Sequence, residues 1–148
     1  MQFSLLVTAF MIAFGGLGAP AAAQTLTSSE AHTLARGRKL LIIDVRPLQD
    51  RLRTGVPVGA VEIDKAQPLE RFLAAVERVT RRNKHANIAL ICVVGALSAE
   101  AQTDLEVVGY TRVVSIADGM EGSANGPGWL ANGLPVRRSR QVPPTKSN

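Results

Sequence analysis

The amino-acid sequence predicts an α/β domain in which a central, mostly parallel sheet is flanked by helices on both faces. Two nearly continuous apolar runs, at residues 40–45 and 88–91, are typical of short buried strands, and another strand is expected at residues 112–116. Segments with helical spacing of apolar residues lie between these runs, and strands separated by helices favour right-handed crossovers and parallel pairing. The chain has 148 residues, about the length of one domain.

The first 23 residues have the pattern of a signal peptide. They carry no charged side chain, and the apolar stretch from Leu5 to Leu17 is shorter than the ~20 residues that span a membrane. Ala21–Ala23 offers the small residues that a signal peptidase requires. We therefore expect cleavage after Ala23, export to a periplasm or the cell exterior, and no stable membrane anchor. An uncleaved anchor is the alternative, because Met1–Ser4 lacks the usual Lys or Arg.

The first predicted helix follows this segment. Thr27 and Glu30 are spaced as a capping box, in which a hydroxyl and a carboxylate three residues later each accept a hydrogen bond from a free backbone N–H. The box predicts a helix to about Arg36, and Gly37 is suited to end that helix in the left-handed conformation. Residues 40–45 then form the first buried strand.

Pro47 ends that strand. Residues 55–59, rich in glycine and proline, are typical of a turn, and a short strand is expected at residues 60–63. A helix begins at about Pro68, because the apolar residues after it have the i, i+3, i+4, i+7 spacing of one buried helical face. They are Leu69, Phe72, Leu73 and Val76. The helix ends in a basic cluster, Arg78 to Lys84, which suits the negative end of the helix dipole.

The second half of the chain repeats this alternation. A buried strand at residues 88–91 runs directly into Cys92, and a helix is expected from Ser98 to Gly109. Another strand follows at residues 112–116, and Asp118–Gly119 forms a turn. Residues 138–148 have little to bury and are predicted to be a disordered basic tail, which leaves residues 24–137 as the folded domain.

Composition excludes several classes of function. The single cysteine excludes an internal disulfide, a Cys-rich zinc site and an iron–sulfur cluster. His32 and His85 are far apart in the sequence with no cysteine beside them, so no metal site is predicted. The net charge is +5, but the basic residues gather at a helix end and in the tail, without the interleaved aromatics that stack on nucleic-acid bases. No nucleic-acid partner is expected.

Cys92 is the candidate for chemistry. It lies at the carboxyl end of a predicted parallel strand, where open α/β sheets bind their ligands. Backbone N–H groups of the following loop, brought close by Gly95, and the positive end of the next helix both favour a thiolate. We expect a reactive sulfur that is open to solvent. The alternative is a buried cysteine that acts as a small hydrophobic residue.

Several motifs in order extend this interpretation. They are Ile42–Arg46, Gly59–Asp64, Cys92–Ser98, Gly109–Val113, Gly119–Met120, Gly128–Trp129 and Gly133–Val136. Each is weak alone, but in this order they make the chain resemble the rhodanese-like domains, a sulfurtransferase family. The resemblance implies a three-layer rhodanese-like fold and the transfer of sulfane sulfur through a Cys92 persulfide. It implies a small donor such as thiosulfate or a persulfide, and an acceptor such as cyanide or a thiol, including a protein thiol.

The same resemblance implies the residues of the site and the absence of a metal or organic cofactor. Cys92 is the catalytic residue. The substrate-binding loop is Val93, Val94, Gly95, Ala96, Leu97 and Ser98. Asp44, Arg46 and Trp129 are expected to support the structure, with Arg46 paired to a carboxylate. The segment 123–127 resembles an insertion that lines the mouth of the pocket.

The chain departs from the family pattern in its loop. Many active members place basic side chains where this chain has Val93 and Leu97. A dianionic donor then lacks one or two charge-assisted contacts, each worth roughly 1.5–3 kcal/mol, so weak use of thiosulfate and a more apolar or protein-bound donor are expected. A non-catalytic binding or regulatory module is one alternative. A phosphatase is another, but Ser98 stands where the phosphate-clamping arginine belongs.

Overall fold

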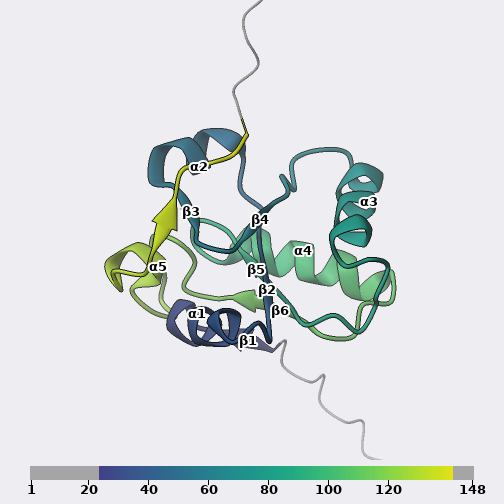
Figure 1. Ribbon diagram of the computed structural model, residues 1–148, viewed down its shortest axis with the longest axis horizontal. Coiled ribbons are helices and arrows are strands. Elements are labelled where there is room, and N and C mark those ends of the chain that lie inside the picture. The colour runs from purple at the N-terminus through teal and green to yellow at the C-terminus, as the bar shows by residue number, and fades with distance from the viewer. Residues whose placement is uncertain (1–23, 142–148) are drawn as a thin grey trace, which may run out of the picture.

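The computed structural model describes residues 24–141. A five-stranded sheet lies at its centre, with helices on both sides (Figure 1). The strands are β1 (Thr25–Leu26), β2 (Leu41–Asp44), β3 (Val56–Pro57), β4 (Val61–Glu62), β5 (Ile88–Ile91), β6 (Val113–Ile116) and β7 (Val136–Arg137). The helices are α1 (Ser28–Arg36), α2 (Leu48–Thr54), α3 (Leu69–Val79), α4 (Ala96–Val107) and α5 (Gly128–Ala131). The predicted signal peptide, residues 1–23, lies outside the described residues.

The sheet has the order β1-β6-β5-β2-β4, and its neighbouring strands pair in parallel. Asp44 at the end of β2 is opposite both Ile91 and Glu62, so β2, β5 and β4 end at one edge of the sheet. Cys92 follows β5 at this edge. Strands β3 and β7 form a separate antiparallel pair. The predicted α/β class with a mostly parallel sheet is confirmed.

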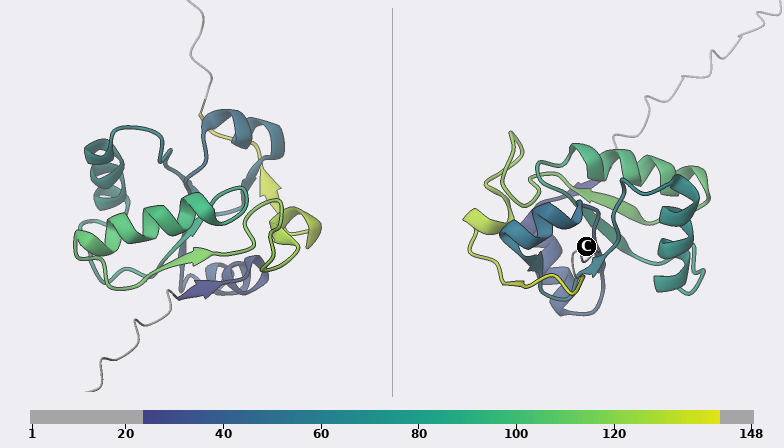
Figure 2. Two further views of the ribbon diagram at one scale, coloured as in Figure 1. Left: turned by 180° about the vertical axis from the view of Figure 1, so that it is seen from behind. Right: turned by 90° about the horizontal axis from the view of Figure 1, so that it is seen from above.

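Alternate residues of the central strands feed two hydrophobic cores. Ile88 and Leu90 face a core with Phe72 of α3 and Leu105 of α4. The intervening residues of β5, Ala89 and Ile91, face a second core, which α1 and α5 cover with Ala31 and Trp129. Figures 1 and 2 show α3 and α4 grouped apart from α1 and α5. Because both faces are covered, β5 is apolar at every position.

Helix α1 begins with the predicted capping box, but Gly37 after its last residue does not adopt the predicted left-handed conformation. The Thr27 hydroxyl accepts a hydrogen bond from the Glu30 N–H, and the Glu30 carboxylate accepts one from the Thr27 N–H, so the capping box is confirmed. The prediction for Gly37 is wrong, because its φ is −77°. Arg38 adopts the left-handed conformation instead, with φ 55°.

Five elements were not predicted, namely β1, α2, β3, α5 and β7, and others begin or end at different residues than expected. Helix α2 occupies residues between Pro47 and the expected turn, and Val56–Pro57, predicted as part of that turn, forms β3 with a partner 80 residues later in β7. Helix α4 begins at Ala96, two residues before the predicted start, and α3 ends before Arg81 and Arg82, which lie in the following turn with positive φ. No helix within residues 24–141 is long and apolar enough to cross a membrane.

The start of the predicted tail lies against the domain. The Arg140 N–H donates to the Glu62 carboxylate at 2.9 Å, and the Ser139 hydroxyl donates to the same group. Gln141 accepts a hydrogen bond of 2.6 Å from the buried guanidinium of Arg51 in α2. Figure 1 shows this last segment passing beside α2. The prediction of disorder from residue 138 onward is therefore wrong for Ser139–Gln141, because their polar groups satisfy buried charges.

A buried carboxylate joins distant parts of the chain. Asp118, predicted only as a turn residue, is fully buried and accepts hydrogen bonds from the Ser28 N–H and the Ser28 hydroxyl at the start of α1. It also accepts one from the Gly128 N–H at the start of α5, at 3.2 Å. The turn after β6 thus holds the N-termini of two helices.

Candidate functional site

The loop after β5 wraps around the Cys92 sulfur. Cys92 Sγ accepts hydrogen bonds from the backbone N–H of Gly95 at 3.2 Å and of Ser98 at 3.3 Å. Gly95 is the N-cap of α4 and Ser98 lies in its first turn, so the free N–H groups of this helix start point at the sulfur. Two donors and a helix N-terminus favour negative charge on Sγ.

Cys92 is recessed, not open. Its side chain is 2% exposed and belongs to the core cluster that contains Val45 and Ile63, with Leu97 packed against it. The expectation of a solvent-open thiol is therefore wrong, although its polar environment has the predicted N–H donors. The sulfur is buried because its own loop closes over it. Any reagent must therefore reach the sulfur through a recess.

Two glycines let the backbone form this recess. Gly95 has a φ of 93°, and a Cβ atom added there would lie 2.4 Å from the Ala117 carbonyl oxygen. Gly119, in the turn after β6, has a φ of 61°, and its added Cβ would lie 2.4 Å from the Val93 carbonyl oxygen. A Cβ atom does not fit at either glycine, so the backbone of the loop packs directly against the backbone of the turn after β6.

The turn after β6 also donates hydrogen bonds to two carbonyl groups of the loop. The Met120 N–H donates to the Cys92 carbonyl at 2.9 Å, and the Glu121 N–H donates to the Val93 carbonyl at 3.0 Å. These carbonyls are satisfied away from the sulfur, so the loop turns N–H groups inward without leaving buried acceptors unpaired. The loop and the segment 119–121 act as one structural unit.

We expect Gly95→Ala to destabilise the loop more than Gly109→Ala. Both glycines have nearly the same φ, 93° and 94°, but an added Cβ at Gly109 has no neighbour within 4 Å. Gly109→Ala should therefore lose about 1–2 kcal/mol for the left-handed backbone alone. Gly95→Ala should lose about 1–3 kcal/mol more, because Ala117 must move. Urea unfolding compares the two, and equal losses would contradict the steric role of Gly95.

The hydroxyl group of Ser98 lies next to the sulfur, and that of Ser115 lies next to Ser98. Ser98 Oγ is 3.5 Å from Cys92 Sγ and donates to the Gly95 carbonyl at 2.9 Å. Ser115 Oγ, from the middle of β6, lies 2.7 Å from Ser98 Oγ. Ser98 was predicted as a loop residue, whereas Ser115 was missed. The available signal was a small polar residue within an otherwise apolar strand, Val113–Ile116.

The remaining loop residues supply an uncharged rim. Val94 is 49% exposed and Ala96 is exposed, while Val93 and Leu97 are partly buried. Within residues 24–141, the side chains of these four residues make no hydrogen bond to the sulfur, as expected of alanine, valine and leucine. The rim offers apolar contact and no charge.

Two cations whose acidic partners lie beside the loop or in α4 are already paired. Arg53 in α2 pairs with Asp50 and with Glu121, which follows the β6 turn. Lys65, after β4, lies 2.9 Å from Asp104 and 3.3 Å from Glu100 in α4. The hydrogen bond from Lys65 to Asp104, assisted by Glu100, raises the pKa of Lys65. Neither cation replaces the missing basic residues of the loop.

Asp44 and Arg46 form the predicted supporting pair. The guanidinium of Arg46 donates to both oxygens of the Asp44 carboxylate, at 2.9 and 2.6 Å, and both side chains are buried. Arg46 also donates to the Thr54 hydroxyl and the Gly55 carbonyl, each at 2.7 Å. The pair therefore joins the end of β2 to the end of α2, next to the Cys92 strand.

A family model for the rhodanese-like domain matches residues 27–125. The chain belongs to the rhodanese-like domain family. The match covers most of the described sequence, including Cys92 and its loop. No curated protein matches the sequence.

Several solved structures share the fold of this rhodanese-like domain. The polysulfide-sulfur transferase homodimer of Wolinella succinogenes matches with 18% identity and a TM-score of 0.58 over 80% of each chain. The rhodanese-like domain of the Anabaena protein Alr3790 matches with 18% identity and a TM-score of 0.60, over 84% of this chain and 86% of that one. The M. tuberculosis protein Rv0390 has 25% identity and a TM-score of 0.61, over 78% of this chain and 97% of that one.

Trp129 lies in the core of the rhodanese-like domain, on the opposite face of the sheet from Cys92. It is fully buried, its indole N–H donates to the Pro135 carbonyl at 3.1 Å, and its ring meets His32 edge-on. The segment 123–127 folds back on itself through paired Ser123 and Gly126, and Gly126 packs on Asp118. These contacts give both features a structural role.

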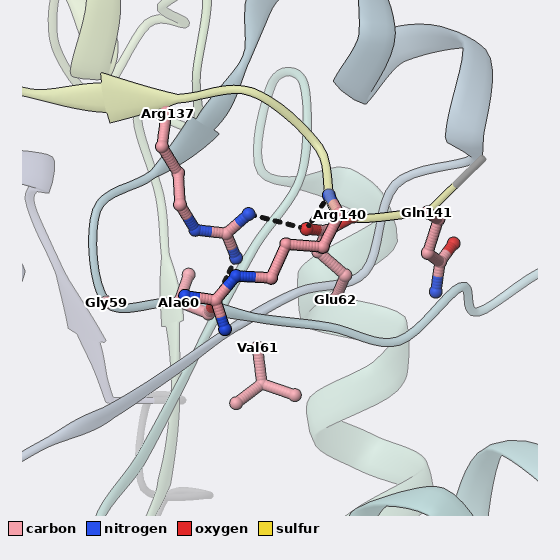
Figure 3. Close-up of a pocket in the computed structure, with 7 residues that line it drawn as sticks. All are labelled: Gly59, Ala60, Val61, Glu62, Arg137, Arg140 and Gln141. Atoms are coloured by element: carbon pink, nitrogen blue, oxygen red, sulfur yellow. Dashed lines mark hydrogen bonds and ion pairs between the residues drawn. The ribbon is translucent and has the colours of Figure 1, made fainter.

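A pocket separate from the Cys92 loop lies at the end of β4 (Figure 3). Its volume is about 310 Å³, and Arg137 and Arg140 extend over the backbone of residues 59–62. Burial alone raises the pKa of Glu62, but hydrogen bonds from the Arg140 N–H, Ser139 and Arg137 outweigh it and lower that pKa from 4.5 to about 2. Within residues 24–141, no three His, Cys, Asp or Glu side chains are grouped to hold a metal ion.

The depressed pKa of Glu62 predicts a pH-dependent loss of stability. A carboxylate whose pKa is lower in the folded state stabilises it above pH 4.5, and this contribution disappears as the pH falls towards 2. Glu62→Gln should reduce the free energy of unfolding by about 1–3 kcal/mol at neutral pH, with the difference vanishing at the acid end. Urea unfolding followed by Trp129 fluorescence measures this. Glu70→Gln, at an exposed carboxylate of α3, is the control, and a pH-independent difference would contradict the prediction.

Proposed function

We propose that this rhodanese-like protein is a sulfurtransferase that carries sulfane sulfur as a persulfide on Cys92. The observation that supports the proposal best is the pair of backbone N–H groups, from Gly95 and Ser98, that donate to Cys92 Sγ. Oriented amides at a helix start stabilise a thiolate and any anion that replaces it. The likeness of fold to the polysulfide-sulfur transferase of Wolinella succinogenes adds to this support.

The proposed reaction needs no cofactor. The Cys92 thiolate attacks the outer sulfur of a donor, and a bond forms between Sγ and that sulfur. The bond between the outer sulfur and the rest of the donor breaks, and its electron pair leaves with a thiolate or, from thiosulfate, with sulfite. A second thiolate, or cyanide, then attacks the outer sulfur of the Cys92 persulfide. The new persulfide or thiocyanate departs and the Cys92 thiolate is restored.

The surroundings of the loop favour a donor other than thiosulfate. The rim is apolar, and Arg53 and Lys65 are already paired with carboxylates. A small dianion gains little from such a rim, whereas a persulfide on an organic or protein carrier can bury apolar surface against Val94. We infer that an organic or protein-bound persulfide is the better donor, and a thiol the natural acceptor. The signal-like segment 1–23 supports the further proposal that the protein acts in a periplasm or outside the cell.

Mass spectrometry of the purified protein tests the proposal. The protein is incubated with thiosulfate, inorganic polysulfide or glutathione persulfide, and its intact mass is measured. Loading should add one sulfur, ~32 Da, to Cys92, and cyanide should remove it as thiocyanate. Glutathione persulfide should load faster than thiosulfate. If none of the three donors loads the thiol, the catalytic proposal fails and a binding or regulatory module becomes the better interpretation.

Restoring a loop cation should increase the use of thiosulfate. Val93→Arg places a guanidinium directly after the nucleophile, and one charge-assisted contact should raise kcat/KM for thiosulfate about tenfold. Val107→Arg is the control, because it adds the same charge at an 80% exposed position at the other end of α4. An equal increase in both variants would show a general charge effect and contradict a local one.

A further inference from the structure

Two buried serines lie together beneath the Cys92 loop. Ser98 is in the first turn of α4 and Ser115 is in β6, and both are almost completely shielded from solvent. Their Oγ atoms are 2.7 Å apart. Ser115 does not reach the sulfur itself, and the proposed sulfur transfer gives it no part.

The protons of this cluster can be assigned when Cys92 is a thiol. A hydroxyl has one proton to donate, whereas a carbonyl oxygen can only accept. Ser98 donates to the Gly95 carbonyl at 2.9 Å, so the Ser115 hydroxyl must donate to Ser98 Oγ. The remaining lone pair of Ser98 then accepts the Cys92 S–H at 3.5 Å. Every group has a partner in this arrangement.

Loss of the thiol proton requires a different arrangement. An anionic Sγ can only accept, so Ser98 can help it by turning its own proton from the Gly95 carbonyl to the sulfur. Ser115 makes this possible. It can keep donating to Ser98 Oγ, which strengthens the Ser98 hydroxyl as a donor, or turn to the Gly95 carbonyl, 3.5 Å away. Without Ser115, neither group gains a replacement partner: the Gly95 carbonyl keeps only the Ala99 N–H, at 3.1 Å, and Ser98 Oγ loses the hydroxyl that donates to it.

We propose that Ser115 is a positioning residue whose hydroxyl allows Ser98 to donate to the Cys92 sulfur when that sulfur is anionic. The inference rests on the proposed function in treating Cys92 as the group that becomes an anion. It goes beyond that function because it assigns a role to a residue of β6 whose hydroxyl is bonded to Ser98 and the Gly95 carbonyl and not to the sulfur.

Charges around the loop do not supply the same effect. The acidic and basic side chains on the surrounding elements are engaged with partners other than the sulfur. They are Asp44 with Arg46, Arg53 with Asp50 and Glu121, Lys65 with Glu100 and Asp104, and Asp118 with Ser28 and Gly128. The histidines lie elsewhere, His32 against Trp129 and His85 beside Thr111. A serine substitution leaves these charges in place.

The test is a pH titration of the Cys92 thiolate by its ultraviolet absorbance in the full chain, with the Cys92→Ser variant subtracted as background. The single cysteine makes the signal assignable. Ser115→Ala should raise the midpoint of the titration by about 0.5–1 pH unit, the equivalent of about one hydrogen bond. Ser115→Thr, which keeps the hydroxyl, should restore the parent midpoint. Ser28→Ala is the matched control, because it removes a buried serine hydroxyl that bonds Asp118 instead.

A double variant separates a role through Ser98 from a direct one. Ser98→Ala should shift the midpoint at least as far as Ser115→Ala, and the combined variant should shift it no further than Ser98→Ala alone. A parent-like midpoint in folded Ser115→Ala, or additive shifts in the combined variant, would overturn the proposal. The titration uses no sulfur donor. The titration therefore tests the role of Ser115 even if Cys92 carries no sulfur. The sulfur-loading experiment tests the proposed function even if Ser115 has no effect on the titration.

Discussion

Cys92→Ser is expected to abolish sulfur loading and transfer completely. Serine keeps a polar atom that can accept from the Gly95 and Ser98 N–H groups, so the loop should keep its shape. Its hydroxyl is not ionised near neutral pH and cannot form the sulfur–sulfur bond that the reaction needs. Thiocyanate release from loaded protein measures the loss, and the intact mass after incubation with glutathione persulfide should remain that of the unmodified chain.

The fold of this variant provides the control. Because Cys92 is 2% exposed within a packed core, the variant should unfold at slightly lower urea concentration with the same cooperativity. Sulfur transfer that persists in folded Cys92→Ser would contradict the central role of Cys92. The chain has no other cysteine, so no second thiol can take over the reaction.

Asp44→Asn is expected to be the most destabilising of the proposed polar substitutions. It leaves the guanidinium of Arg46 buried without its carboxylate, and breaking a buried ion pair on one side costs about 3–5 kcal/mol. The two oxygens of Asp44 accept three hydrogen bonds from Arg46, including its backbone N–H. Urea unfolding followed by Trp129 fluorescence measures the loss in the free energy of unfolding.

A double variant keeps this prediction testable if Asp44→Asn fails to fold. Arg46→Met in the same chain removes the unpaired charge and fills similar space, so the double variant should be more stable than Asp44→Asn alone. It should still fall below the parent, because Arg46 also holds Thr54 and the Gly55 carbonyl. A double variant less stable than Asp44→Asn would contradict the ion-pair explanation.

The sequence predicted the central sheet well because buried parallel strands leave a strong local signal. The apolar run at residues 88–91 coincides with β5, and the helical spacing after Pro68 coincides with α3. The capping box marked the start of α1 for the same reason, since all of its hydrogen bonds lie within four residues. The cysteine that follows β5 could then be placed at the correct edge of the sheet.

Features that depend on distant contacts could not be predicted in the same way. Strand β3 forms because β7 returns beside it, and Ser139–Gln141 is held in place by hydrogen bonds to Glu62 and Arg51, which are distant in the sequence. The depth of Cys92 depends on how its loop meets the turn after β6, which no local pattern encodes. The closeness of Ser115 to Ser98 depends on how α4 packs on β6, which the sequence does not reveal.

Asp118 makes the opening and closing parts of the domain depend on each other. Its carboxylate is satisfied by Ser28 near the beginning and by Gly128 near the end. In a shortened chain that starts after Ser28, the buried Asp118 carboxylate would lose its two hydrogen bonds from Ser28. Asp118 directly precedes Gly119, which packs against the loop around the sulfur. Any recombinant fragment intended to report on Cys92 must therefore retain the residues from Thr25 onward, including the edge strand β1.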